Sequence, residues 1–173
     1  MHLNIEIKAR SGNASFVRNY LQQQGAEYKG TDQQTDTYFN TTSGRLKLRQ
    51  GNIENNLIWY NRANQEGPKS STFRLYPAGD GVSLLAMLTG ALGIKVVVKK
   101  SREIYYINNV KFHIDTVEGL GSFVEIEAGN ILAPLTAAEL EAQCRFYMQA
   151  FRIEEKDLLK HSYSDMLMAN GAE

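Results

Sequence analysis

The feature that most constrains the fold of this sequence is a regular alternation of ionic or polar side chains with aliphatic ones, which recurs in four separate stretches. Because successive side chains of a β-strand point to opposite faces, each stretch predicts a strand with one ionic face and one apolar face. A solvated face of an antiparallel sheet also alternates, but it usually mixes Thr, Ser, Gln and Lys. Here Arg, Lys and Glu are concentrated, which favours a site for a polyanion and a divalent cation. The four ionic faces carry Asn4, Glu6, Lys8 and Arg10, then Arg45, Lys47 and Arg49, then Lys100 and Arg102, and finally Glu125 and Glu127.

The composition indicates one ordinary folded domain spanning residues 1–173. The chain has 43% hydrophobic residues and zero formal net charge, and its length suits a single core. A neutral chain argues against binding of nucleic acid or a membrane surface through an overall field, so an anion site has to be local. The first residues do not resemble a signal peptide, and no stretch approaches the roughly 20 apolar residues of a membrane span. We therefore expect a cytoplasmic protein, and its oligomeric state, including a homodimer, is left open.

Periodicity and turn residues predict eight strands and four helices. Short strands joined by short turns favour antiparallel pairing, and closing such a sheet into a barrel removes its exposed edges. We therefore expect an α+β fold, a closed or nearly closed eight-stranded antiparallel β-barrel with helices packed outside, an aliphatic outer face and an ionic interior. The expected strands are 3–10, 34–40, 45–51, 56–63, 70–76, 95–107, 110–117 and 121–128. The expected helices are 13–24, one that begins at Asp80 or Ser83 and ends at Leu92, 136–151 and 154–168.

The inward side chains of these strands would form one basic and one acidic set. Burying many like charges is costly unless an anion or water compensates them, and Arg offers a bidentate fork to phosphate oxygens. The acidic set supplies hard oxygen ligands suited to Mg²⁺ or Mn²⁺. The basic set is Lys8, Lys47, Arg49, Arg62, Arg74, Lys100 and Arg102, and the acidic set is Glu6, Glu125 and Glu127 with Asp115 as a fourth candidate.

Several motifs resemble a known family in order and spacing. Asn4 to Lys8 is similar to its Glu-x-Glu-x-Lys signature, Gln34 to Phe39 to its second strand, and Arg45 to Arg49 to its basic strand. Lys100 to Tyr105 and Asp115 to Glu127 resemble its second half. The chain thus resembles a CYTH domain, the group of triphosphate tunnel metalloenzymes that includes class IV adenylyl cyclases and thiamine triphosphatases.

The resemblance implies a triphosphate-bearing small molecule as substrate and a divalent metal as cofactor. By matching position, Glu6, Glu125 and Glu127 would hold the metal, with Glu6, Glu125 and Asp115 in catalytic positions. The motif cations Lys8, Lys47, Arg49, Arg62, Lys100 and Arg102 would grip phosphates. Arg74 joins them through strand parity alone, and Lys160 is expected to cap the tunnel from the last helix.

One departure from the family pattern keeps three functions open. Asn4 stands where the signature has its first Glu, so one formal charge is missing from the metal shell. An amide oxygen still ligates Mg²⁺ weakly or through water. Phosphoanhydride hydrolysis is the favoured activity; cyclisation of ATP to cyclic AMP and non-catalytic binding of a nucleotide or polyphosphate are the alternatives.

Overall fold

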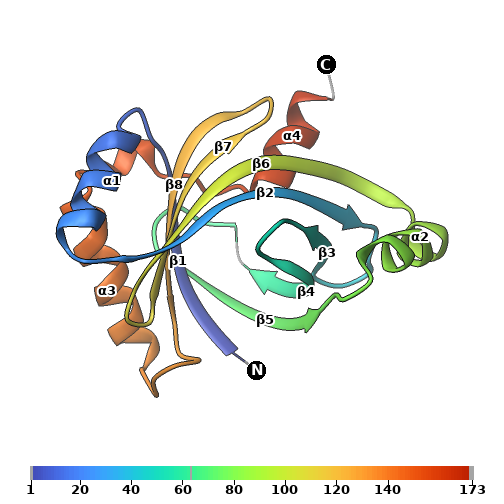
Figure 1. Ribbon diagram of the computed structural model, residues 1–173, viewed down its shortest axis with the longest axis horizontal. Coiled ribbons are helices and arrows are strands. Elements are labelled where there is room, and N and C mark those ends of the chain that lie inside the picture. Colours follow the sequence, from blue (N-terminus) through green and yellow to red (C-terminus); the bar gives the residue numbers. More distant parts are fainter. Residues whose placement is uncertain (1, 63, 172–173) are drawn as a thin grey trace.

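The eight strands close into one antiparallel barrel (Figure 1). This computed structural model describes residues 2–62 and 64–171. Around the barrel the strands follow the order β1-β5-β4-β3-β2-β6-β7-β8, and β8 pairs with β1 to complete the ring. The predicted fold class is therefore confirmed. The strands are β1 (His2–Arg10), β2 (Glu27–Phe39), β3 (Arg45–Gln50), β4 (Asn55–Arg62), β5 (Lys69–Pro77), β6 (Ile94–Ile107), β7 (Val110–Val117) and β8 (Gly121–Gly129).

The register of the strands brings distant ionic residues together. Across the β1–β8 pair, Glu6 lies opposite Glu127 and Lys8 lies opposite Glu125. Across the other edge of β1, Glu6 also faces Lys69 of β5. Residues opposite one another have neighbouring side chains on the same face, so this register builds a mixed acidic and basic wall.

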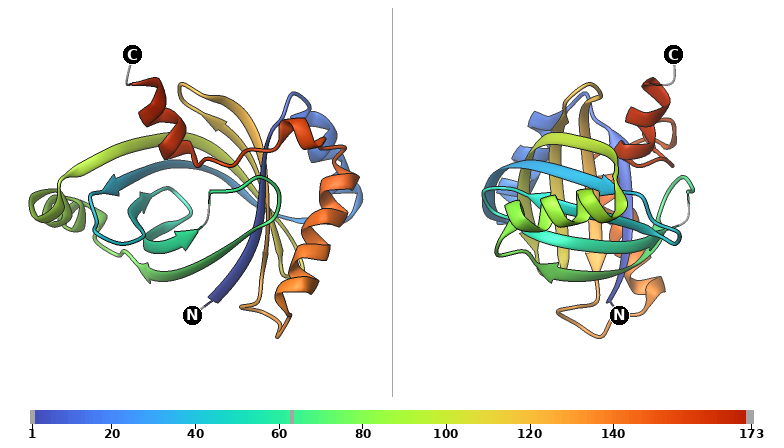
Figure 2. Two further views of the ribbon diagram at one scale, coloured as in Figure 1. Left: turned by 180° about the vertical axis from the view of Figure 1, so that it is seen from behind. Right: turned by 90° about the vertical axis from the view of Figure 1, so that its right-hand side faces the viewer.

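The aliphatic face of the barrel points outward, as predicted, and two helices cover part of it. Helices α1 (Ala14–Gln23) and α3 (Ala137–Ala150) lie on one end of the barrel, and α3 packs on β1 and β8 (Figure 2). Asn13 caps α1, and the Thr136–Glu139 capping box starts α3, which satisfies backbone donors that the first helical turn leaves free. The core under these helices includes Ile5, Ile7, Ala9, Val17, Leu21, Phe112, Ile126, Leu140 and Cys144.

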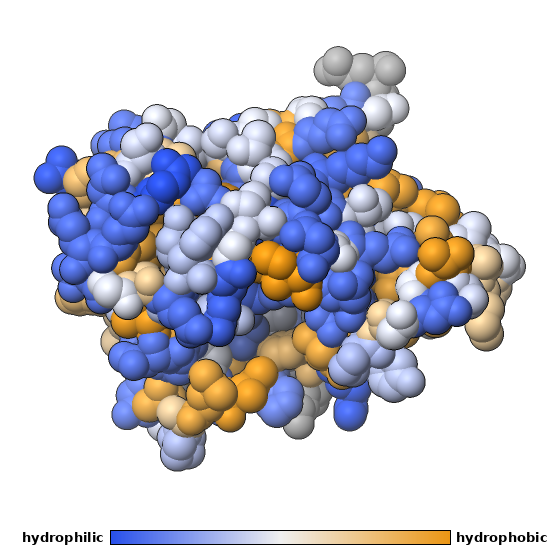
Figure 3. Space-filling view, in the orientation of Figure 1, coloured by the Kyte–Doolittle hydropathy of each residue, from blue (hydrophilic) through white to orange (hydrophobic). Residues whose placement is uncertain are grey.

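Helix α2 (Gly81–Leu92) lies at the opposite end of the barrel from α1 and α3 (Figures 1 and 2). Leu84, Leu85 and Leu88 pack against a small core of Phe39, Leu48 and Ala78. Other apolar side chains remain exposed on this end, including Met87 of α2, and the space-filling view shows apolar residues gathered there (Figure 3). Among the described helices, none has both the length and the apolar character needed to cross a bilayer.

The C-terminal segment differs from the prediction of one helix over 154–168. It forms a short 3-10 turn, η1 (Glu155–Asp157), an extended piece, and helix α4 (Tyr163–Asn170). β1 pairs with β5 only as far as Glu6, so its edge beyond that residue is free. Leu158 forms a bridge with Ala9 on this edge, and the amide of Leu159 donates to the carbonyl of Lys8 at 2.9 Å. The backbone groups on this edge of β1 need hydrogen-bond partners. Leu158 and Leu159 supply them in an extended conformation, in place of the middle of the expected helix.

Candidate active site in the barrel interior

The ionic faces line a cavity of about 150 Å³ inside the barrel. Among the described residues, seven cations and five carboxylates reach this cavity from strands β1, β2, β3, β4, β6, β7 and β8 and from the turn before β4. The predicted ionic interior is thus present. The cations are Lys8, Lys47, Arg49, Arg62, Lys100, Arg102 and Lys111, and the carboxylates are Glu6, Asp36, Glu54, Glu125 and Glu127.

Three of the carboxylates form a compact cluster at the β1–β8 pair. One ligand oxygen from each of Glu6, Glu125 and Glu127 lies within 4.8 Å of the others. The amide of Asn4 donates a hydrogen bond of 2.7 Å to Glu127 Oε1. Residue 4 therefore supports the cluster with a neutral group where a further carboxylate would add charge.

The environment of this cluster suits a bound cation. Burial raises the pKa of Glu127, and the neighbouring Glu125 adds to the shift. Burial alone would also raise the pKa of Glu125, but Lys8 and Arg102 hold it well below the ordinary value. A divalent cation would remove the unfavourable burial of negative charge at Glu127, and hard oxygen donors are the ligands that Mg²⁺ and Mn²⁺ prefer.

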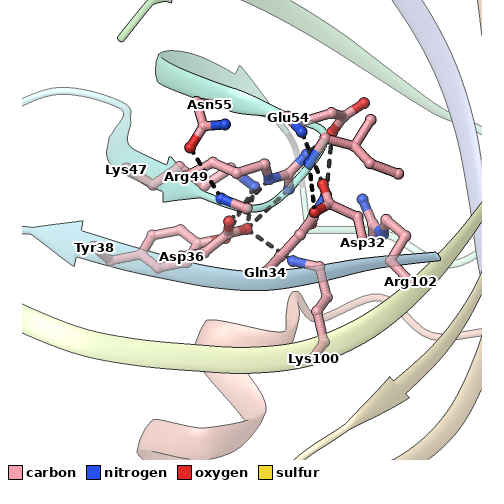
Figure 4. Close-up of polar contacts among 12 residues, drawn as sticks. Asp32, Gln34, Asp36, Tyr38, Lys47, Arg49, Glu54, Asn55, Lys100 and Arg102 are labelled. Carbon is pink, nitrogen blue, oxygen red and sulfur yellow. Dashed lines mark hydrogen bonds and ion pairs between the residues drawn. The ribbon is translucent and has the colours of Figure 1, made fainter. Parts of the chain in front are cut away.

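Asp36 of β2 is the partner of three cations on the basic wall (Figure 4). Arg49 makes two hydrogen bonds of 2.9 Å to its two carboxylate oxygens. Lys47 and Lys100 approach Oδ2 at 3.1 and 2.8 Å. These cations are thereby held side by side and pre-oriented, because a single buried carboxylate fixes the position of all three.

A second ionic group joins the basic wall to the acidic cluster. Arg102 makes hydrogen bonds of 2.7 and 2.6 Å to the two oxygens of Asp115 and one of 3.1 Å to Glu125. Lys8 lies 3.8 Å from the same Glu125 oxygen. Arg62 pairs with Glu6, while its Nε and second terminal nitrogen have no hydrogen-bond partner among residues 2–62 and 64–171. Buried guanidinium donors of this kind are suited to an oxyanion.

Comparison with known protein families identifies the family of this chain. The family model of the CYTH domain matches residues 2–163. The chain belongs to the CYTH domain family. The comparison of this CYTH domain with curated proteins found no match.

Solved structures share the fold of this CYTH domain at low sequence identity. The PH1012 protein of Pyrococcus horikoshii is 23% identical, with a TM-score of 0.77 over 94% of this chain and 98% of that one. A candidate adenylate cyclase from Vibrio parahaemolyticus is 20% identical, with a TM-score of 0.77 over 96% and 98%. A protein from Hippeastrum, described as a candidate adenylyl cyclase with a dominant triphosphatase activity, is 15% identical, with a TM-score of 0.61 over 100% and 97%.

Two predicted phosphate-binding residues lie outside the cavity of the CYTH domain. Arg74 is exposed, because the inward residues of β5 are the odd-numbered ones. Lys160 has a side chain that is 53% exposed and lies 3.8 Å from Glu66, away from the interior. Their predicted places in the tunnel are therefore wrong.

Asp115, predicted near the metal end, is buried but separate from the carboxylate cluster. Its oxygens accept hydrogen bonds from Arg102 and from the hydroxyl of Tyr163. The cluster of described acidic residues within ligand distance consists of Glu6, Glu125 and Glu127. The geometry therefore indicates that the role of Asp115 is to position Arg102. This role differs from that of a fourth metal ligand, which we expected from the sequence.

The interior also contains ionic residues that the sequence analysis did not single out. Asp36 and Lys111 lie on inward positions of β2 and β7, so a complete parity analysis of those strands could have found them. Glu54 precedes β4 in a turn, where no periodicity exists; its amide donates to Asp32, which places its side chain against Arg49 and Lys111. Lys69, fully buried, donates to the carbonyls of Leu159 and Lys160.

His113 of β7 lines the cavity beside the acidic cluster. Burial and the nearby charge of Arg102 lower its pKa to about 4, so the ring is neutral near pH 7. Nδ1 lies 3.7 Å from Glu125 Oε2. Because the ring is neutral, the net charge of the cavity is set by its lysines, arginines and carboxylates.

Proposed function

We propose that this CYTH domain binds the complex of a divalent metal with a triphosphate inside the barrel and hydrolyses a phosphoanhydride bond. The observation that supports this most directly is one cavity that joins a three-carboxylate cluster to a wall of lysines and arginines. Cations suit phosphate oxygens, and the carboxylates suit the metal. The phosphate groups of one bound complex would thus contact the lysines and arginines, and its metal would contact the carboxylates.

The formal charge of the cavity fits this ligand. Seven cations against five carboxylates leave an excess of two positive charges among the described lining residues. A divalent cation at the acidic cluster raises the excess to four, and a triphosphate carries up to about four negative charges. Buried charge has to be compensated locally, so the loaded cavity would be close to neutral.

The chemistry follows from position and charge. Hydrolysis is attack by water on the terminal phosphorus, which breaks its bond to the bridging oxygen and leaves a diphosphate and a phosphate. Lys47, Lys100 and Arg49 would hold the phosphate oxygens and stabilise the charge that develops on them, which is the main contribution a protein makes to phosphoryl transfer. A divalent cation held by Glu6, Glu125 and Glu127 would supply further neutralisation of phosphate charge.

Cyclisation of ATP is the second candidate, because the structural neighbours include a candidate adenylate cyclase. The triphosphatase activity described for the Hippeastrum protein favours hydrolysis. Both reactions would use the same phosphate and metal groups. They differ in whether water or the ribose 3′-hydroxyl attacks, and in which phosphorus is attacked.

The test is an assay of the purified protein with ATP, thiamine triphosphate and inorganic triphosphate, each with Mg²⁺ or Mn²⁺. Release of phosphate supports hydrolysis, and cyclic AMP from ATP identifies a cyclase. Tight binding without product overturns the catalytic proposal and identifies a binding protein. The Glu125→Gln variant is expected to lose both turnover and Mn²⁺ binding measured by calorimetry, whereas Glu141→Gln, on the exposed face of α3, is expected to keep both.

A further inference from the structure

Donors from three strands of the barrel converge on the carboxylate of Glu54, which lines the cavity from the turn between β3 and β4. Arg49 of β3 and the amide of Gln34 of β2 donate to Oε2 at 2.8 and 3.2 Å. Lys111 of β7 donates to Oε1. A guanidinium, an ammonium and an amide are also the donors that bind a phosphate group. The carboxylate of Glu54 therefore fills an anion site of the protein with one of its own side chains.

A buried carboxylate fixes the turn that carries Glu54. Asp32 of β2 is fully buried and lies beside Glu54 in the close-up (Figure 4). Its oxygens accept hydrogen bonds of 2.7, 3.0 and 2.9 Å from the backbone amides of Asn52, Ile53 and Glu54. Charge-assisted hydrogen bonds from successive amides leave a turn little conformational freedom. The Glu54 side chain therefore extends to the cavity from a fixed backbone position.

The carboxylate of Glu54 is charged near pH 7 and excludes a second anion from its place. Burial alone would raise its pKa, but the charges of Lys111 and Arg49 hold the pKa well below the ordinary value of 4.5. The side chain is only 17% exposed, so water and salt screen its charge weakly. A phosphate group could take this position only by displacing the carboxylate from both cations.

The ion pair of Glu54 with Lys111 lies next to the acidic cluster. Lys111 is opposite Glu127 across the β7–β8 pair, and Glu127 is opposite Glu6 across the β1–β8 pair. Residues opposite one another have neighbouring side chains on the same face. A phosphate group bound to a metal at this cluster would therefore have the Glu54 carboxylate as a neighbour.

The charge balance of the cavity also depends on Glu54. Without its carboxylate, seven cations would face four carboxylates among the described lining residues, and the positive excess would rise from two to three. Buried charge has to be compensated locally. A phosphate chain that is longer by one group brings additional negative charge to the cavity. The carboxylate of Glu54 thus supplies compensation that a longer chain would otherwise provide.

We propose that Glu54 is a specificity-determining residue that limits the phosphate chain of the substrate to three groups, because its carboxylate occupies the anion site that a fourth phosphate would take. This inference rests on the proposed function of the same cavity and adds the length of chain that the cavity accepts. Asp32 has a positioning role in it, since its hydrogen bonds to the turn hold Glu54 between Arg49 and Lys111.

The test compares inorganic tetraphosphate with inorganic triphosphate, with the same metal, in the wild type, Glu54→Ala and Glu54→Gln. The readouts are kcat/KM from initial rates of phosphate release and Kd from calorimetry. We expect the wild type to prefer triphosphate. Glu54→Ala removes both the charge and the volume of the carboxylate, so the ratio of tetraphosphate to triphosphate should rise by about tenfold or more. This is the size expected when one charge-assisted contact is gained.

Two further variants complete the design. Glu54→Gln removes the charge but keeps the volume, so its ratio should rise by a smaller factor, and it keeps the test informative if Glu54→Ala folds poorly. The matched control is Glu66→Ala, at a carboxylate that is 61% exposed outside the cavity and lies 3.8 Å from Lys160. Its ratio should equal that of the wild type.

The outcomes separate this inference from the proposed function. A wild type that accepts tetraphosphate as readily as triphosphate overturns the inference and leaves the proposed function standing. An unchanged ratio in the folded Glu54 variants does the same, including the case in which both values fall together because Glu54 only supports Arg49 and Lys111. A wild type that neither consumes nor binds any triphosphate, organic or inorganic, removes both.

Discussion

The hydroxyl of Tyr163 donates a hydrogen bond of 2.7 Å to a carboxylate oxygen of Asp115, although the two residues are 48 positions apart in the sequence. Tyr163 is the first residue of α4, and its ring centre lies 3.8 Å from the ammonium of Lys8. Asp115 in turn orients Arg102. The C-terminal segment is therefore part of the cavity wall, and it fixes groups that belong to three strands of the barrel.

We expect the Tyr163→Phe variant to lose about 2 kcal/mol of unfolding free energy, because a buried hydrogen bond to a charged acceptor is removed while the ring stays. The ring keeps its contact with Lys8, so the fold should be retained. The measurement is denaturant unfolding of both proteins, with Tyr76→Phe as the control at a tyrosine that is 68% exposed. Equal losses in the two variants would show that the hydrogen bond to Asp115 contributes nothing specific.

The Asp36→Asn variant should have opposite effects on two quantities: the Tm of the free protein and the rise in Tm when metal and triphosphate are added. Arg49, Lys47 and Lys100 would lose their shared carboxylate, and breaking a buried ion pair typically costs about 3–5 kcal/mol. A bound triphosphate would supply the missing negative charge. We therefore expect a lower Tm for the free variant and a larger rise in Tm on adding metal and triphosphate than in the wild type. A smaller rise in Tm would contradict the placement of phosphate beside these three cations.

The lowered pKa of Asp36 allows a prediction of how the stability of the protein depends on pH. Burial alone would raise the pKa of Asp36, but the charges of Arg49, Lys100 and Lys47 hold it well below its ordinary value of 3.8. Because the pKa is lower in the folded state, the stabilisation is present above about pH 4 and is lost as the pH falls through that range toward the folded pKa. Unfolding midpoints at pH 7, 5, 4 and 3 should fall more steeply for the wild type than for Asp36→Asn. Parallel curves would show that other acidic groups account for the acid sensitivity.

The sequence predicted the ionic strands well because their alternation is regular. Lys47 and Arg49 of β3, and Glu125 and Glu127 of β8, follow the rule that one parity is ionic and the other aliphatic, and the interior contains them as expected. The rule fails on β5, where the inward parity carries Phe73 and Leu75 and the outward parity carries Arg74. Polarity could not assign the faces of that strand, since the second half of its inner surface, Phe73 and Leu75, is apolar.

The contribution of the C-terminal segment could not be predicted from local pattern. The helical spacing of residues 154–168 gives no information about the edge of β1 that β5 leaves unpaired, because that edge lies about 150 residues earlier in the chain. Lys69 was missed because the predicted strand began at residue 70, whereas β5 begins at Lys69, whose ammonium donates to the carbonyls of Leu159 and Lys160. Contacts between segments so distant in sequence leave no periodic signal in either segment.

Gly44, immediately before β3, tests how tightly the start of the basic strand is constrained. Its φ is +67°, a left-handed conformation that strains other residues, and an added Cβ would lie 2.8 Å from Trp59 Nε1 and 2.9 Å from the carbonyl oxygen of Tyr60. The indole of Trp59 is held by its hydrogen bond of 3.1 Å to the carbonyl of Ser43, so it cannot easily move aside. We expect Gly44→Ala to lower the unfolding free energy by more than about 1 kcal/mol.

Gly90→Ala is the matched substitution, for which we expect the unfolding free energy to change in the opposite direction. Gly90 lies inside α2 with no atom within 4 Å of an added Cβ. Alanine is favoured over glycine in a helix interior by about 0.5–1 kcal/mol, so Gly90→Ala should raise the unfolding free energy by that amount. Thermal and denaturant unfolding of the two variants would show shifts in opposite directions. If Gly44→Ala were as stable as Gly90→Ala, the turn would tolerate a side chain, and the entry of β3 into the cavity wall would be less fixed than its geometry indicates.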